Sequence, residues 1–308
     1  MSLALLSCIL LLSILVGLSA SNLFFVICML ELSMFSFLFM NYEYKLLSSV
    51  SGCIKYFFSQ SVGSMMLFWG GVVISLNLIS QSANLLIFSG FILKLGGFPM
   101  FFWVIPVNSS LSYLMIGILS SPMKILPLAL MVEFFSFYMT HISNYVSVVL
   151  FSGVLSMITG LFLGLGSKTL RSMLGASSIS HTGWLFISMP ISLTWQYFFL
   201  YSLGIFSFFV SVVLCYNYFS ALGLLCLAGL PPFSVFTAKL LVIMGWLYTS
   251  MSGVFLVIVL ITSVLSFFYY MKYSFVYYLV NMPTEKIFWV GMVLFFINLS
   301  SSVCLLYL

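Results

Sequence analysis

Apolar runs of about twenty residues follow one another along nearly the whole chain, separated by short polar, Gly- or Pro-containing breaks. A transmembrane helix needs about 20 consecutive apolar residues. The runs are continuous and do not alternate with period two, which excludes the strands of a membrane barrel. Charged residues make up 4% of the 308 residues, against about 25% in soluble domains. The chain is therefore expected to be an all-α polytopic membrane protein.

The breaks divide the sequence into about eleven candidate transmembrane helices. They are placed at about 2–19, 22–41, 54–79, 84–106, 111–139, 145–166, 170–190, 195–217, 219–249, 252–279 and 287–307. Because the connecting segments are short, residues 1–308 are expected to form a single transmembrane domain with no extramembrane domain.

Basic residues in the loops indicate the orientation of the chain. The loops after the second, sixth and tenth helices lie on the side of the N-terminus. With their flanks they hold Lys45, Lys55, Lys168, Arg171, Lys272 and Lys286, whereas the opposite loops hold no Lys or Arg. Positive charge gathers on the side from which a membrane protein is inserted, so we expect the N-terminus there and the C-terminus opposite.

Other residue types exclude several kinds of site. The formal net charge is +5, but the basic residues are scattered singly, which gives no indication of nucleic-acid binding. The six cysteines form no CxxC pair and no paired spacing with the two histidines, so neither a metal site nor a disulfide framework is indicated. No haem, iron–sulfur or nucleotide-binding motif is present, and no cofactor is expected in this chain.

Five ionisable residues fall inside the predicted spans, namely Glu31, Lys94, Lys124, His181 and Lys239. A lysine at a helix centre costs about 2.5–3.5 kcal/mol on insertion, and such residues mark proton or ion paths. Burial penalises the charged form of a lysine, and a neighbouring carboxylate favours it. Moving Glu31 towards or away from Lys94 would therefore switch that lysine between its charged and neutral forms. We predict a mid-membrane proton relay built from these residues. Glu133 lies on the face of its helix opposite Lys124 and is not included.

Two of the lysines lie beside helix breakers. Lys94 precedes Gly96-Gly97-Phe98-Pro99, and Lys239 follows Gly229-Leu230-Pro231-Pro232. Proline removes a backbone donor and clashes with the preceding turn, so helices 84–106 and 219–249 are expected to be broken inside the membrane. Broken helices in corresponding halves are typical of transporters with inverted repeats. An inverted repeat with a central ion path is therefore expected.

The alternative interpretation is that these charges pair simply to hold helices together. For His181 the neighbouring hydroxyls of Ser177, Ser178, Ser180 and Thr182 offer hydrogen bonds that need no relay.

A set of short segments recurs in a familiar order between about residues 22 and 245. They are Leu30–Leu32, Ile54–Gln60, Leu93–Gly96, Phe102–Val104, Met123–Pro127, Leu170–Arg171, Ser177–Trp184 and Ala228–Phe233, which leads to Lys239. Together they resemble the family of mitochondrial NADH dehydrogenase subunit 2. Two places depart from the family pattern, because Phe101 stands where a histidine is common and Ile105-Pro106-Val107 replaces an acidic residue.

The resemblance implies an antiporter-like inverted repeat and a proton-translocating core subunit of the membrane arm of respiratory complex I, in the mitochondrial inner membrane. The N-terminus would face the matrix and the C-terminus the intermembrane space. Glu31 and Lys94 would be the charge pair that couples conformational change to pumping. Lys124 would be the connecting residue of the relay. His181 would bridge the path between Lys124 and Lys239, and Lys239 would lie towards the exit side.

The same resemblance implies that NADH oxidation and ubiquinone reduction take place in partner subunits, which would carry FMN and iron–sulfur clusters. Other membrane-arm subunits, accessory subunits and lipid, with cardiolipin as one candidate, are the implied partners. A subunit of a multi-subunit sodium/proton antiporter is the alternative, from a family that usually carries three further N-terminal helices. A scaffold that only assists assembly is a third hypothesis.

Overall fold

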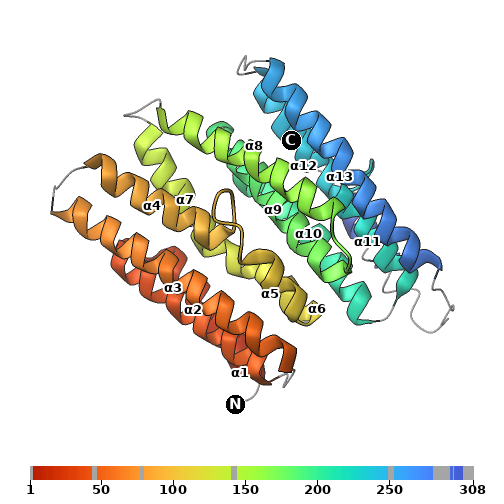
Figure 1. Cartoon of the computed structure of the whole chain (residues 1–308), viewed down its shortest axis with the longest axis horizontal. Coiled ribbons are helices and arrows are strands. Elements are labelled where there is room, and N and C mark those ends of the chain that lie inside the picture. The colour runs from red at the N-terminus through yellow and green to blue at the C-terminus, as the bar shows by residue number, and fades with distance from the viewer. Residues whose placement is uncertain are drawn as a thin grey trace. The chain divides into compact units, whose positions relative to one another are not determined.

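The computed structural model describes residues 3–43, 47–76, 80–139, 144–214, 216–248, 253–279, 292–293 and 295–300. Across these ranges the chain is built of helices with short connections and contains no strand (Figure 1). Its contacts group into two compact units, Met1–Tyr145 and Val146–Leu308. The single transmembrane domain expected from the sequence stays a prediction.

In its described residues the first unit contains seven helices. A close approach of α3 and α4 positions its functional residues. The helices are α1 (Leu3–Ser19), α2 (Leu23–Glu43), α3 (Leu47–Ser75), α4 (Ser80–Leu95), α5 (Val104–Ser110), α6 (Tyr113–Ser120) and α7 (Pro122–Met139). Gly63 of α3 meets Gly90 of α4 so closely that a Cβ on Gly90 would lie 3.0 Å from the Gly63 carbonyl oxygen. Small residues permit such approach between membrane helices, and it brings the end of α4 against α3.

The second unit is arranged around one buried helix. Its elements are α8 (Asn144–Leu165), which begins at the boundary between the units, α9 (Leu170–Ser188), the 3₁₀ turn η1 (Met189–Ile191), α10 (Thr194–Val213), α11 (Asn217–Ala228), α12 (Ser234–Tyr248) and α13 (Gly253–Leu279). Apart from Arg171 and Ser172, every residue of α9 is buried. Gly153 and Gly160 of α8 lie against the α9 backbone, which lets the two helices pack closely.

The expected fold class is confirmed, because the described chain is all-α and six of its helical stretches are long and apolar enough to cross a membrane. Shorter apolar helices, among them α4, α11 and α12, accompany them. The predicted helices 84–106 and 219–249 are indeed broken, into α4 and α5 and into α11 and α12. Most of the predicted span 287–307 lies outside the described residues; 295–300 are helical.

The two breaks, residues 96–103 and 229–233, begin with the same backbone pattern. Gly96 and Gly229 both have positive φ, at 74° and 85°, a conformation that glycine adopts without steric cost. The next residue then donates five positions back, from Gly97 to Ile92 and from Leu230 to Leu225, at 3.0 and 3.4 Å. Such a Schellman-type ending closes a helix. The sequence shows no detailed repeat, but the backbone conformation at the start of the two breaks is the same. The inverted relation of the two halves stays a prediction.

The predicted helix 111–139 contains an interruption that the sequence did not indicate. Residues Tyr113–Ser136 form one apolar stretch long enough to cross a membrane, but the helix is interrupted at Ser121, where φ is −121° and ψ is −76°. Pro122 then becomes the first residue of α7. A proline is favoured at the first helical position because its missing N–H would be unpaired there anyway. The new helix start places Lys124 in the first turn of α7.

Candidate functional site

The predicted relay residues lie in both units. Glu31 on α2, Lys94 on α4 and Lys124 on α7 belong to the first unit, whereas His181 on α9 and Lys239 on α12 belong to the second. The three lysines and His181 are buried, with at most 8% of each residue exposed. Buried groups of this kind need compensating partners, and those partners differ between the units.

Glu31 and Lys94 form an ion pair in the first unit, as predicted. Lys94 Nζ lies 3.6 Å from Glu31 Oε1, and the Lys94 side chain is 1% exposed against 28% for Glu31. Lys94 also occupies the last turn of α4, where the partial negative charge of the helix end favours an ammonium. Charge on Lys94 is thus stabilised by a carboxylate and by its own helix.

Neutral side chains satisfy the carbonyl groups that α4 leaves at the first break. Trp103 Nε1 donates to the Leu93 carbonyl at 2.9 Å, and Gln60 Nε2 of α3 donates to the Lys94 carbonyl at 3.4 Å. The last carbonyls of a helix have no partner within the helix, and an unsatisfied backbone group inside a membrane costs several kcal/mol. Because these two side chains supply donors, the Lys94 amine remains available to Glu31.

Lys124 is buried in the first turn of α7, with 7% of the residue exposed. Its backbone N–H donates to the Ser121 carbonyl at 3.1 Å, across the short interruption between α6 and α7. Glu133, on the same helix, is exposed; its place outside the relay stays a prediction. Continuity of the relay from Lys124 to His181 stays a prediction.

Lys239 closes the second break itself. Its Nζ donates to the carbonyl oxygen of Ala228, the last residue of α11, at 2.8 Å. The same nitrogen lies 5.9 Å from the centroid of the Trp184 ring, within cation–π range. A Cβ at Gly229 would lie 3.0 Å from this nitrogen, so a glycine there leaves room for the amine.

His181 is held by two tyrosines that sequence reasoning missed. Its Nδ1 lies 2.8 Å from the Tyr197 hydroxyl and its Nε2 lies 3.2 Å from the Tyr270 hydroxyl. The nearby hydroxyls of α9 donate to backbone carbonyls one turn earlier, from Ser177, Ser178, Ser180 and Thr182. The alternative that hydrogen bonds satisfy His181 without any relay stays a prediction, as the relay does.

Aromatic contacts join His181 to Lys239. The Trp184 ring below the Lys239 amine stacks on Tyr197 with centroids 6.0 Å apart, and Tyr197 bonds His181. Tyr201, one turn further along α10, places its ring 4.3 Å from the imidazole. The i, i+4 spacing of Tyr197 and Tyr201 was a visible signal that both face one side of a helix, but which side could not be known.

The arrangement contains side chains of the types that exchange protons, and the described residues offer no ligand set for a metal. No group of three or more His, Cys, Asp or Glu side chains in the described part of the chain could hold a metal ion. Lysine and histidine exchange protons, and tyrosine hydroxyls both donate and accept hydrogen bonds. Proton transfer between these buried groups stays a prediction.

Comparison with known proteins defines the class. The family described as "NADH:quinone oxidoreductase/Mrp antiporter, TM" matches residues 19–221. Three solved structures share the fold. A chain of respiratory complex I from Thermus thermophilus with bound aureothin matches with a TM-score of 0.80 and 17% identity, covering 99% of this chain and 77% of that chain. A chain of the Mrp complex from a Dietzia species matches with a TM-score of 0.78 and 16% identity (89% of this chain, 61% of that chain), and a chain of an archaeal membrane-bound sulfane sulfur reductase with a TM-score of 0.80 and 16% identity (96% and 72%). The molecule is a membrane subunit of the antiporter-like type.

Curated relatives identify the particular family. NADH-ubiquinone oxidoreductase chain 2 from Albinaria caerulea is 32% identical over 276 residues, covering 89% of this chain and 89% of the relative. The protein of that name from Locusta migratoria is 32% identical over 246 residues, covering 72% and 69%. The chain belongs to the NADH-ubiquinone oxidoreductase chain 2 family, which confirms the resemblance seen in its motifs.

Proposed function

We propose that this chain is a proton-translocating subunit of the membrane arm of NADH:ubiquinone oxidoreductase, in the mitochondrial inner membrane. The observation that carries the proposal is the set of buried ionisable residues beside two helix breaks, in a chain that belongs to the chain 2 family. The N-terminus would face the matrix, in agreement with the positions of Lys168, Arg171 and Lys272.

The Glu31–Lys94 pair would act as the switch. While the carboxylate lies 3.6 Å from Nζ, the ammonium form of Lys94 is favoured. If Glu31 moves away, burial disfavours that charge, and the ammonium passes its proton to a water or a neighbouring base and becomes a neutral amine. Return of the carboxylate draws a new proton onto the amine. The cycle conserves protons and needs no covalent intermediate.

Lys124 would be the connecting residue of the relay. In the second unit, His181 would exchange protons through the Tyr197 and Tyr270 hydroxyls, and Lys239 would be the residue towards the exit. Moving one charge against 100 mV costs about 2.3 kcal/mol. We propose that NADH oxidation and ubiquinone reduction in partner subunits, with their FMN and iron–sulfur clusters, supply that energy.

A subunit of a sodium/proton antiporter is the second candidate, because the fold is also similar to a chain of an Mrp complex. Coverage favours the first candidate. The alignment covers 61% of the Mrp chain but 89% of the Albinaria relative.

Native gel electrophoresis of gently solubilised membranes separates the two candidates. The gel is stained for NADH oxidation, and the bands are identified by mass spectrometry. We expect the chain in a very large band with NADH activity. A smaller band without that activity would support the antiporter.

The relay is tested in the assembled complex with Lys94→Met, which removes the switched charge. We expect fewer protons pumped per electron, measured in sealed vesicles, whereas Lys272→Met on the exposed face of α13 should leave the ratio unchanged. Normal pumping with Lys94→Met would contradict the relay. A lower yield of complex with an unchanged ratio would support the scaffold hypothesis.

A further inference from the structure

The second unit holds a buried hydroxyl that lies outside the proposed relay. Tyr269 of α13 is 2% exposed. Among the described residues of this unit, its hydroxyl oxygen is the one buried side-chain polar atom that makes no hydrogen bond of standard geometry. The hydroxyls of Ser180, Ser266 and Tyr270 lie near it. Buried polar groups are almost always hydrogen-bonded, and an exception indicates a bound water or a role in the chemistry.

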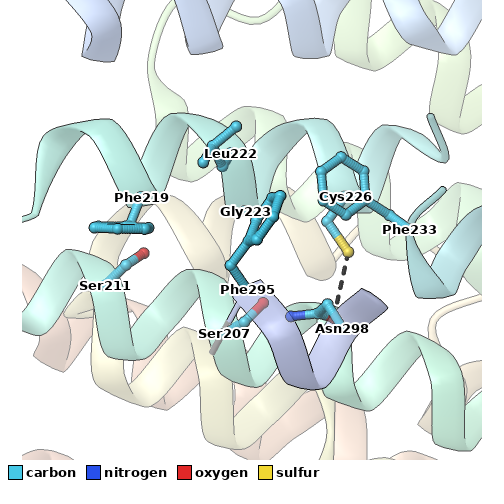
Figure 2. Close-up of a pocket in the computed structure, with 9 residues that line it drawn as sticks. All are labelled: Ser207, Ser211, Phe219, Leu222, Gly223, Cys226, Phe233, Phe295 and Asn298. Atoms are coloured by element: carbon cyan, nitrogen blue, oxygen red, sulfur yellow. Dashed lines mark hydrogen bonds between the residues drawn. The ribbon is translucent and has the colours of Figure 1, made fainter. Parts of the chain in front are cut away.

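A pocket elsewhere in this unit shows the usual situation. Its polar side chains, beside α10 and α11, are paired within the chain (Figure 2). The Cys226 thiol donates to Asn298 Oδ1 at 3.5 Å. The Ser207 and Ser211 hydroxyls donate to backbone carbonyls one turn earlier. That pocket therefore needs no ligand, whereas the Tyr269 hydroxyl is left with unused hydrogen-bonding capacity.

Tyr269 belongs to a row of tyrosines on the buried face of α13. Tyr270 lies beside it, with ring centroids 4.6 Å apart, and the Tyr270 hydroxyl is the one 3.2 Å from His181 Nε2. Tyr273 follows Tyr269 one turn later, at the i, i+4 spacing that places two side chains on the same face. The Tyr273 hydroxyl donates to the Ser167 carbonyl at 3.0 Å and lies 3.2 Å from the Ser167 hydroxyl. The row therefore extends from the imidazole to Ser167.

Ser167 brings the end of the row to the surface of the chain. It lies in the loop 166–169 between α8 and α9, and the other three residues of that loop are exposed. The loop contains Lys168, and Arg171 follows it closely. Positive charge gathers on the side of insertion, which is the matrix side in the proposed function.

Gly164, the last residue but one of α8, contacts both ends of the gap in this row. A Cβ at Gly164 would lie 2.9 Å from two carbons of the Tyr269 ring and 3.3 Å from the carbon that carries the hydroxyl. The Gly164 carbonyl accepts the Ser167 hydroxyl at 2.6 Å. Tyr269 and Ser167 thus meet at one residue. Buried water typically bonds to polar groups that are otherwise unsatisfied, as the Tyr269 hydroxyl is.

We propose that Tyr273, Tyr269 and Tyr270 form a proton-uptake branch from the surface at residues 166–169 to His181, with water at the Tyr269 hydroxyl completing it. Each hydroxyl can accept one proton while it donates its own, so the tyrosines are unchanged after each passage. The solution loses one proton, and the imidazole gains it. The branch rests on the proposed function, and it gives His181 a source of protons that does not pass through Lys124.

The branch is tested with Tyr269→Phe and Tyr273→Phe in the assembled complex. Each variant keeps the ring and removes the hydroxyl. We expect the rate of proton pumping in sealed vesicles to fall by about two- to tenfold, the loss that corresponds to one hydrogen bond in the path. Tyr278→Phe, on the exposed face of α13, is the matched control. Normal pumping in both variants, beside impaired pumping in Lys239→Met, would overturn the branch and leave the relay standing. Normal pumping in Lys239→Met would overturn the relay and the branch with it.

Thermal unfolding separates the branch from a packing role. Tyr269→Phe keeps the ring against Gly164 and removes a hydroxyl without a standard hydrogen bond, so the unfolding temperature of the complex should not fall. A slower rate accompanied by a lower unfolding temperature would assign Tyr269 to packing and overturn its part in the branch. High-resolution cryo-electron microscopy of the natural complex gives a readout without turnover. We expect density for water within hydrogen-bonding distance of the Tyr269 hydroxyl, and its absence would overturn the branch.

Discussion

The two helix breaks share a backbone pattern but differ in the groups that close them. At the first break, Trp103 and Gln60 satisfy the exposed carbonyls, and Lys94 pairs with Glu31. At the second break, the Lys239 amine satisfies the Ala228 carbonyl directly. The first lysine can lose its proton without loosening its helix end, whereas the second takes part in the closure.

This difference indicates distinct tasks for two lysines that the sequence places in similar settings. A lysine facing a carboxylate responds to movement of that carboxylate, because the attraction between opposite charges is long-ranged. A lysine bonded to a carbonyl responds to the geometry of the break. We therefore expect charge coupling at Lys94 and conformational coupling at Lys239.

Lys239→Met should have the largest effect. It removes a titratable group and leaves the buried Ala228 carbonyl without this donor, at a cost of about 1–3 kcal/mol for an unsatisfied polar group. We expect loss of most proton pumping together with a lower thermal unfolding temperature of the purified complex. Lys94→Met, where other side chains close the break, should lower pumping with a smaller change in unfolding temperature. Equal changes in unfolding temperature would contradict the comparison.

The Glu31–Lys94 pair should behave as one unit. Glu31→Gln and Lys94→Met should each lower the protons pumped per electron, and the double variant should be no worse than the more severe single variant, because contacting residues are not additive. Glu31→Gln combined with Lys239→Met, which lie in different units, serves as the control. If the losses of pumping in Glu31→Gln and Lys94→Met simply add in the double variant, the result would argue against the switch.

Tyr270→Phe should have an intermediate effect. It removes the hydroxyl that lies 3.2 Å from His181 Nε2 and preserves the ring. The net contribution of one hydrogen bond is about 0.5–1.5 kcal/mol, and its loss corresponds to a decrease of about two- to tenfold in the rate of proton transfer. The decrease is measured as the rate of proton pumping in sealed vesicles. Tyr278→Phe, on the exposed face of α13, is the matched control. An unchanged rate would remove Tyr270 from the path.

Trp103→Phe should have the smallest effect. It removes the indole donor to the Leu93 carbonyl, but the Gly96 N–H also approaches that carbonyl, at 3.3 Å. The loss should therefore be about 1 kcal/mol or less in stability, with pumping nearly unchanged. Thermal unfolding of the complex measures the loss. A severe pumping defect would show that the first break, like the second, depends on its closing group.

Much of the fold could be predicted from the sequence because membrane helices are read from continuous apolar runs and breaks from Gly and Pro. The interruption at Ser121 was missed although Pro122 signals a helix start, since the apolar run continues across it. The Glu31–Lys94 pair was predicted from opposite charges in a medium that excludes lone ones. The Tyr197 and Tyr270 contacts were not, because they depend on how α9, α10 and α13 face one another, and no local pattern encodes that.

The bond between the Lys239 amine and the Ala228 carbonyl has a spectroscopic consequence. The stretching frequency of a backbone carbonyl falls when a charged donor bonds to it and rises when the bond is lost. A carbon-13 label at the carbonyl of Ala228 would shift its infrared band away from those of other peptide groups. The polypeptide would then report the charge on its own lysine during turnover, without any dye attached to the protein.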